Sequence, residues 1–356
     1  MSAGDDSGRS LDRTQLLRWA GLAAAGAALP GSLSDAMRGA AAPGFLRPHP
    51  RWRFVFVNHA VTNPFFVPAR YGIEDACSIF GTSFSWTGSS RSDVDEMVQA
   101  VRKAIRERAD GIAISIIDPR SFNKPTVEAL EHGIPVVAYN ADGGHGNRRL
   151  AYVGQDLYQS GLKVGARIAE LVHEGDVFLF IATPGQLNIQ PRIDGALDAI
   201  RDSGKPIRAR AVATGVDLRK ERVTIDATYR KHKNLRGMFA VDGGSTQGVA
   251  DVMRKHRLRK LGVRAGGYDL LPRTLQAIAD GHMDFTIDQQ PYLQGFVPTL
   301  QLFLAKYSGG LVAPSDTNTG LLFVTRGNVR RYITTSTRYE GSSALEQYPV
   351  RPRAVP

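Results

Sequence analysis

Polar and aromatic side chains gather where short β-rich segments of the chain end. Asparagine, aspartate, glutamine and arginine are frequent there, and phenylalanines accompany them. An aromatic ring beneath an apolar face, with fixed donors and acceptors around its rim, suits a small hydroxyl-rich molecule. We therefore expect recognition of hydroxyl groups at the following segments: residues 58–66, 118–119, 140–142, 183–192, 242–247, 268–270 and 288–290.

These segments follow β-rich runs that alternate with amphipathic helical stretches. The run from 92 to 109 has apolar residues at helical spacing, and Ser92 with Asp95 predicts a capping box at its start. Alternation of this kind predicts βαβ units and doubly wound parallel sheets, in which ligands bind at the carboxyl ends of the strands. The expected strands are residues 53–58, 111–117, 135–140, 177–183, 208–213, 237–241, 263–269 and 285–289.

The composition favours two medium-sized cores rather than one. The chain has 356 residues, 42% hydrophobic, and a formal charge of +11. The densest basic run, residues 254–260, falls where a helix should end, which suits a solvated helix C-terminus. We therefore expect no nucleic-acid partner. The one cysteine, Cys77, lies in an apolar helical pattern and is expected to be a buried structural thiol.

The N-terminal segment has the pattern of an export signal. Three arginines precede an apolar run, residues 19–29, which is too short to span a bilayer. The segment resembles a twin-arginine signal in which Asp12 replaces one arginine; a disordered or loosely helical tail is the alternative. We assign residues 1–43 to the signal and 44–50 to a linker. The signal leads us to expect a periplasmic or otherwise extracytoplasmic protein. No later segment is long and apolar enough for a membrane helix, so we expect no stable membrane insertion.

Six motifs occur in a fixed order at the strand ends. They are Asn63-Pro64-Phe65-Phe66, Gly133 to Asn140, Tyr152 to Asp156, Gln190-Pro191-Arg192-Ile193-Asp194-Gly195, Phe239 to Asp242 with Gly266 to Asp269, and Phe285 to Pro291. In this order the chain resembles the type I periplasmic solute-binding proteins of the ribose-binding-like family of sugar ABC transporters. The resemblance covers residues 51–339.

The resemblance implies a set of ligand-binding residues. Phe65 and Phe66 would stack on the sugar and the others would bond its hydroxyls, although core packing of both rings and a surface position for Arg192 are the alternatives. Where many members end a strand with Asp-Arg, this chain has Asn140 and Ala141, and Asp142 is a substitute partner. The expected site is Asn63, Phe65, Phe66, Asn140, Asp142, Asp156, Arg192, Asp242, Asp269 and Gln289.

The resemblance also implies an α/β protein of two doubly wound, Rossmann-like lobes joined by a three-crossover hinge. The N-terminal lobe would comprise residues 51–155 and 290–318, the C-terminal lobe 156–289 and 319–340, and a tail 341–356. Its function would be that of the exported substrate-binding component of an ABC importer, capturing a sugar or sugar alcohol without catalysis, cofactor or metal. Its partners would be a permease and its ATPase, and we expect a monomer.

Two other classes of protein share parts of this pattern. A repressor on the same core would need a helix-turn-helix, whereas residues 1–50 hold an apolar run and a proline-rich linker. A Rossmann-type enzyme would need a glycine fingerprint at the first strand-to-helix turn, which is absent there. The carboxylates Asp118, Asp142, Asp242 and Asp269 would also suit a hydrolase. Pentoses, hexoses, sugar alcohols and a cyclic furanosyl signal molecule all remain open as ligands, as does a signalling role.

Overall fold

The structure is a computed structural model that describes residues 48–310 and 316–334. The predicted export signal, most of the linker and the predicted tail lie outside the described residues. One compact unit begins at Arg51 and holds all the helices and strands given below. No helix of the described part is long and apolar enough to cross a membrane.

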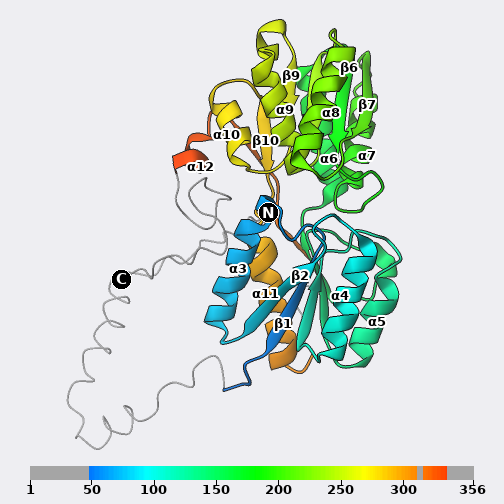
Figure 1. Cartoon of the computed structure of the whole chain (residues 1–356), viewed down its shortest axis with the longest axis vertical. Helices are drawn as coiled ribbons and strands as arrows, with labels where there is room; N and C mark the ends of the chain where they lie inside the picture. The colour runs from blue at the N-terminus through cyan, green and yellow to red at the C-terminus, as the bar shows by residue number, and fades with distance from the viewer. Residues whose placement is uncertain (1–47, 311–315, 335–356) are drawn as a thin grey trace, which may run out of the picture. The chain divides into compact units, whose positions relative to one another are not determined.

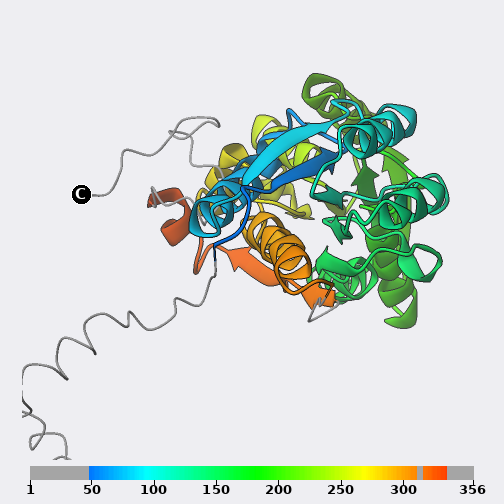
Figure 2. The ribbon, with the colours of Figure 1, turned by 90° about the horizontal axis from the view of Figure 1, so that it is seen from below.

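The first lobe is built on a parallel sheet of six strands in the order β11-β5-β4-β3-β1-β2. In Figure 1 helices α3 and α11 lie together on one face of this sheet, and α4 and α5 lie on the other. The view from below shows the same layers (Figure 2). The strands are β1 Arg53–Asn58, β2 Ser83–Gly88, β3 Gly111–Ile114, β4 Val136–Tyr139, β5 Ala151–Gly154 and β11 Asp316–Asn318. The helices are η1 Pro64–Phe66, α3 Val67–Ile79, α4 Val94–Arg106, α5 Asn123–Glu131, η2 Gly144–Gly146 and α11 Leu293–Tyr307.

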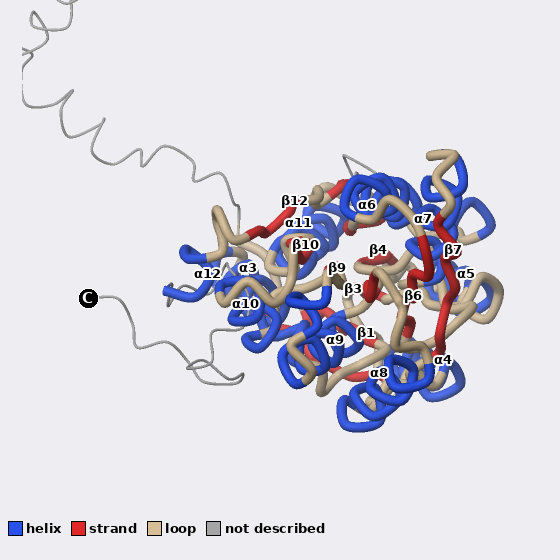
Figure 3. Tube along the Cα trace, turned by 90° about the horizontal axis from the view of Figure 1, so that it is seen from above, coloured by secondary structure: helices blue, strands red, loops and turns tan. Residues whose placement is uncertain are grey.

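The second lobe repeats this plan with one antiparallel edge strand. Its sheet has the order β12-β10-β9-β8-β6-β7, and β12 pairs antiparallel with β10. Figure 3 shows α6 and α7 on one face and α8 and α9 on the other. The strands are β6 Gly175–Ile181, β7 Ile207–Ala213, β8 Gly237–Ala240, β9 Arg264–Gly266, β10 Phe285–Asp288 and β12 Leu322–Thr325. The helices are α6 Leu157–Leu171, α7 Gln190–Asp202, α8 Leu218–Lys231, α9 Gly243–Lys255, η3 Leu258–Leu261, α10 Pro272–Ala279 and α12 Arg330–Thr334.

The described chain crosses between the two sheets three times. It leaves the first sheet after β5, returns between β10 and α11, and leaves again between β11 and β12. This confirms the predicted fold of two doubly wound lobes with a three-crossover hinge. The predicted residue boundaries of the lobes stay a prediction.

Helices on both faces explain why the central strands are buried throughout. All residues of β3, β4, β8 and β10 are buried, and apolar side chains from the flanking helices pack against them. Cys77 is buried on α3, as predicted, and burial raises the pKa of its thiol to about 11. A buried, protonated thiol fits a structural role.

The predicted capping box of helix α4 is wrong by one residue. Asp93 is the N-cap, and its carboxylate accepts from the Glu96 backbone N–H over 3.0 Å. Ser92 has a left-handed φ of 61° instead of the extended backbone of an N-cap residue, and its hydroxyl donates to the His59 carbonyl oxygen over 3.3 Å. The segment before α4 is therefore shaped by contacts with the end of β1.

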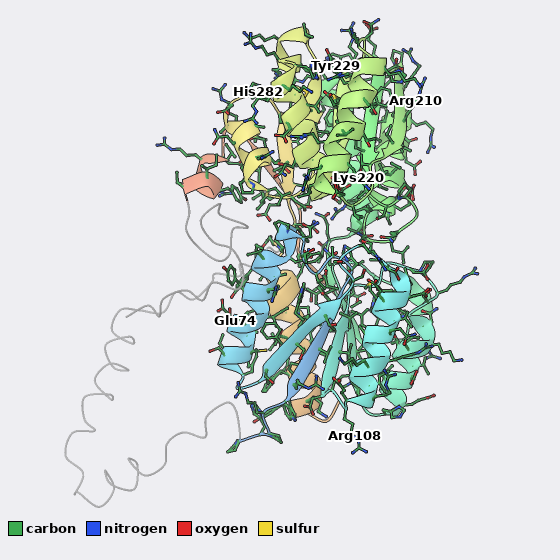
Figure 4. All side chains as sticks on the ribbon, viewed as in Figure 1. Glu74, Arg108, Arg210, Lys220, Tyr229 and His282 are labelled. Carbon is green, nitrogen blue, oxygen red and sulfur yellow. The ribbon has the colours of Figure 1, made fainter. Side chains whose placement is uncertain are left out.

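Several basic side chains of the described residues extend into solvent. Arg108 and Arg210 point away from the elements that carry them (Figure 4) and are exposed. In the basic run, Lys255 pairs with Asp226 over 3.0 Å and Arg259 with Asp284 over 2.8 Å. This is the solvated helix terminus that the sequence predicts.

Candidate functional site

A cavity of about 180 Å³ lies where the carboxyl ends of strands from both lobes face each other. A cavity of this size suits one small ring rather than a longer chain of rings. Eight of the ten predicted residues line it. They are Asn63, Phe65, Phe66, Asn140, Arg192, Asp242, Asp269 and Gln289.

Arg192, in the first turn of α7, is the buried cation of this cavity. Its side chain is 2% exposed and its guanidinium lies 4.2 Å from the centroid of the Tyr268 ring. Nη1 donates to the Val241 carbonyl oxygen over 2.9 Å, and Nη2 donates to Gln289 Oε1 over 3.0 Å. Nε is buried without a hydrogen-bond partner in the described part of the chain. Protein acceptors thus hold both Nη groups of the planar guanidinium, and Nε is the donor left for another partner.

Close packing of two helices positions this arginine. Helices α6 and α7 approach through glycines, and a Cβ on Gly161 would lie 2.4 Å from the Arg192 carbonyl oxygen. A Cβ on Gly195 would lie 2.3 Å from the Tyr158 carbonyl oxygen. Since real Cβ atoms do not approach so closely, glycine at both positions allows α7 to lie where Arg192 reaches the cavity.

The aromatic wall comes from the turn after β1. Asn63 caps the short helix η1 by accepting from the Phe65 backbone N–H over 3.0 Å. This turn places the rings of Phe65 and Phe66 with centroids 4.7 Å apart, edge to face. Trp86 packs behind Phe66 at 5.9 Å and is not among the lining residues. An apolar surface therefore faces the polar groups of the second lobe.

A chain of amide hydrogen bonds joins the cavity to the crossovers. Asn140 Nδ2 donates to Gln294 Oε1 over 3.0 Å, and Gln294 Nε2 donates to the Gln289 carbonyl oxygen over 3.1 Å. Gln289 Nε2 donates to Asp269 Oδ1 over 2.6 Å. Asn140 and Asp269 both have left-handed backbones, with φ of 63° and 75°. Strain at non-glycine residues of this kind is characteristic of functional sites.

The two aspartates that line the cavity, Asp242 and Asp269, differ in their roles. Asp242 caps α9, accepting from the Ser245 and Ala182 backbone N–H groups, each over 2.9 Å. Burial raises the pKa of Asp269 to about 6, while the positive charge of Arg192 opposes the rise. Asp269 is therefore an acceptor at neutral pH, held between an arginine and a glutamine.

Two predicted residues are not brought to the cavity. Asp142 forms a bidentate ion pair with Arg149, with distances of 2.5 and 2.7 Å. Asp156 caps α6 by accepting from the Gln159 backbone N–H over 3.0 Å. Both carboxylates are occupied by protein groups outside the cavity lining.

His59, Asn188 and Glu221 are among the lining residues that were not singled out from the sequence. His59 Nδ1 lies 2.8 Å from Ser115 Oγ and its Nε2 lies 3.2 Å from Asn188 Nδ2. Burial lowers the pKa of His59 to about 4, so the ring is neutral. His59 and Asn188 lie in segments already flagged as strand ends. Glu221 lies on α8, away from any strand end, and no sequence signal pointed to it.

Direct hydrogen bonds also join residues of the two lobes outside the crossovers. The Leu187 backbone N–H donates to the Ile117 carbonyl oxygen over 2.9 Å, and Gln186 Nε2 donates to the Ser92 carbonyl oxygen over 3.0 Å. These bonds and the His59–Asn188 contact hold residues of the two lobes against each other. The structure thus has the lobes together.

The sequence of the chain is similar to a known protein family and to a known sugar-binding protein. Residues 54–305 match the family described as periplasmic binding protein domain. The xylose/arabinose-binding protein XylF of Sulfolobus acidocaldarius is 49% identical over 319 residues, covering 85% of this chain and 78% of that protein.

Solved structures with the same fold include an ABC transporter solute-binding protein from Burkholderia graminis in complex with D-arabinose. It has a TM-score of 0.74 and 24% identity, and covers 82% of this chain and 100% of its own. The arabinose-binding protein AraP of Geobacillus stearothermophilus has a TM-score of 0.65 and 26% identity, and covers 79% of this chain and 99% of its own.

Proposed function

Because this chain belongs to the periplasmic binding protein family, we propose that it captures a sugar or sugar alcohol in the cavity between its lobes, as the substrate-binding component of an ABC importer. The observation that carries the proposal is Arg192. Its Nη groups are held by protein acceptors, whereas its buried Nε has no partner among the described residues. Buried donors are normally satisfied, so a ligand oxygen is the expected partner.

Pentoses are the first candidates within this class. The relative of 49% identity is named for xylose and arabinose. A cavity of about 180 Å³ with an aromatic wall and a polar rim suits one sugar ring. Phe65 and Phe66 would face the apolar side of that ring, while Asn63, Asn140, Arg192, Asp269 and Gln289 would bond its hydroxyls. Asp242, whose carboxylate already accepts from two backbone N–H groups, would also accept a hydrogen bond from a sugar hydroxyl.

Binding would be coupled to closure of the lobes. Groups from both lobes line the cavity, so the full set of contacts exists only when the lobes are together. A ligand that touches both lobes therefore shifts the equilibrium toward the closed form by its differential affinity. The permease and its ATPase would recognise that closed form.

The test is a thermal-shift and calorimetric screen of the full chain, unfolded and refolded to remove any carried-over sugar. D-xylose, L-arabinose, D-arabinose, hexoses, sugar alcohols and nucleotides would be compared. A ligand at 100 times its Kd adds about 2.7 kcal/mol to the free energy of unfolding, which raises the Tm by several degrees. Stabilisation by a sugar that is recovered unchanged supports the proposal. Stabilisation by a nucleotide alone contradicts it.

The extracytoplasmic location is a part of the proposal that rests on residues 1–43. Their arginines and short apolar run support export. Fractionation of cells that express the full chain and a variant lacking residues 1–43 tests this directly. Retention of both forms in the cytoplasm would contradict export.

A further inference from the structure

Glu221 is a buried carboxyl group in the wall of the cavity. It lies in the first turn of α8, is 2% exposed and lines the cavity beside Asp242 and Gly244. Its Oε2 atom is buried and has no hydrogen-bond partner within residues 48–310 and 316–334. A buried carboxyl oxygen without a partner is costly to retain, so a partner is expected from outside the chain.

The start of α9 is shaped to seat this carboxyl group. A Cβ on Gly244 would lie 2.4 Å from Glu221 Oε2 and 2.6 Å from Oε1. A Cβ on the preceding Gly243 would lie 2.9 Å from Asp269 Oδ2. The two glycines after Asp242 thus leave room for one carboxyl group each. Glu221 is held at a defined place on the cavity wall.

The surroundings of Glu221 favour its neutral form. Burial and the nearby charge of Asp242 raise its pKa to about 9, while the Ser245 hydroxyl opposes the rise and Asp217 adds to it. A neutral carboxyl group has one O–H donor and one free acceptor. At neutral pH the residue can therefore donate a hydrogen bond, which ionised Asp269 cannot do.

We propose that Glu221 is a specificity-determining residue whose neutral carboxyl group donates a hydrogen bond to an oxygen of the bound sugar. The inference rests on the proposed function. Together with Arg192 it would give the cavity a second donor, in addition to the acceptor Asp269 that lines the same cavity. A site of this kind favours uncharged sugars over sugar acids, because the carboxylate of a sugar acid would lie among carboxyl groups of the second lobe.

The test compares three variants of the refolded full chain by calorimetry with D-xylose and L-arabinose. Glu221→Ala removes both the donor and the acceptor, and we expect its affinity to fall at least tenfold. Glu221→Gln keeps an uncharged donor and acceptor, and we expect affinity within about threefold of wild type. Glu131→Ala, an exposed glutamate at the end of α5, is the matched control and should bind as wild type does.

Thermal unfolding without ligand separates recognition from structure. Removing an unpartnered buried carboxyl group should leave the Tm of the unliganded Glu221→Ala variant at or above that of wild type. A structural role would lower the Tm instead. We therefore expect a fall in affinity without a fall in Tm, an outcome that a loss of folding cannot imitate.

A pH series supplies the second measurement. Wild-type affinity should fall about tenfold between pH 8 and pH 10, as the proton is lost through a pKa near 9. Asp242, Asp217 and Asp269 also act on this part of the cavity, so Glu221→Gln at the same pH values is the reference and should stay flat.

The outcomes distinguish the two proposals. If wild type binds a sugar and Glu221→Ala binds it equally well, the role of Glu221 is refuted and the proposed function stands. If Glu221→Ala loses both affinity and unliganded stability, the residue is structural and the inference is again wrong. If wild type binds no sugar or sugar alcohol, the proposed function fails and this inference fails with it.

Discussion

Arg192 donates from Nη2 to Gln289 Oε1 over 3.0 Å, which links helix α7 to the crossover that follows β10. The same guanidinium lies over Tyr268 and keeps Nε without a protein partner among the described residues. One side chain therefore touches both the cavity and the segment about which the lobes would move. A ligand that bonds Arg192 is placed to influence the crossover through Gln289.

Replacement of Arg192 by alanine should abolish sugar binding while the protein still folds. We expect affinity to fall about a hundredfold or more, because a charge-assisted donor is lost and Gln289 Oε1 loses one of its two donors. Arg192→Lys, which keeps the charge but not the planar fork, should recover only part of the affinity. Calorimetry measures both, with cooperative thermal unfolding as the control for folding. Wild-type affinity in Arg192→Ala would refute the site assignment.

Replacement of Gly195 by alanine should separate helices α6 and α7. The added Cβ would lie 2.3 Å from the Tyr158 carbonyl oxygen, so the free energy of unfolding should fall by ~1–3 kcal/mol even though alanine favours helix. Sugar affinity should fall too, because α7 carries Arg192. Gly327→Ala is the control, since its nearest neighbour would be 3.7 Å away. Urea unfolding measures this free energy. An unchanged value for Gly195→Ala would contradict the packing argument.

Acidification should destabilise the protein through His59. Its pKa is about 4 in the folded protein and about 6.5 when unfolded, so the unfolded chain binds more protons between these values. The free energy of unfolding should therefore decrease as pH falls from about 6.5 to about 4, by up to about 3 kcal/mol from this group. His59→Asn should lack that component in urea titrations at pH 7 and pH 4.5. An identical pH dependence in variant and wild type would refute the assignment.

Asp156 should act through helix α6 rather than through the ligand. Asp156→Ala removes the N-cap and should lower the free energy of unfolding by ~1 kcal/mol with sugar affinity unchanged. Asp156→Asn retains a capping oxygen and should match wild type in both measurements. Loss of affinity in Asp156→Ala at unchanged stability would instead support the direct ligand contact that the family resemblance implied.

The sequence by itself determined the order of elements and the residues that stand at strand ends. Hydrophobic periodicity and the residues that end helices and strands are local properties of the chain. For this reason β1 was predicted with the bounds that the structure has, Arg53–Asn58. In a doubly wound fold the carboxyl ends of the strands converge, and this placed Asn63, Arg192 and Gln289 near one another before any coordinates. The family motifs added the roles expected of those residues.

Only the tertiary structure decided what each carboxyl group does. Asp142, Asp156 and Asp242 all follow a strand, yet one pairs with Arg149, one only caps a helix, and one both caps a helix and lines the cavity. Which of these occurs depends on side chains and helix ends that arrive from distant parts of the chain. Glu221 depends on such packing entirely, because α8 must lie against Gly244 before its carboxyl group reaches the cavity. Local sequence patterns describe one element at a time, whereas burial and charge arise from the contacts between elements.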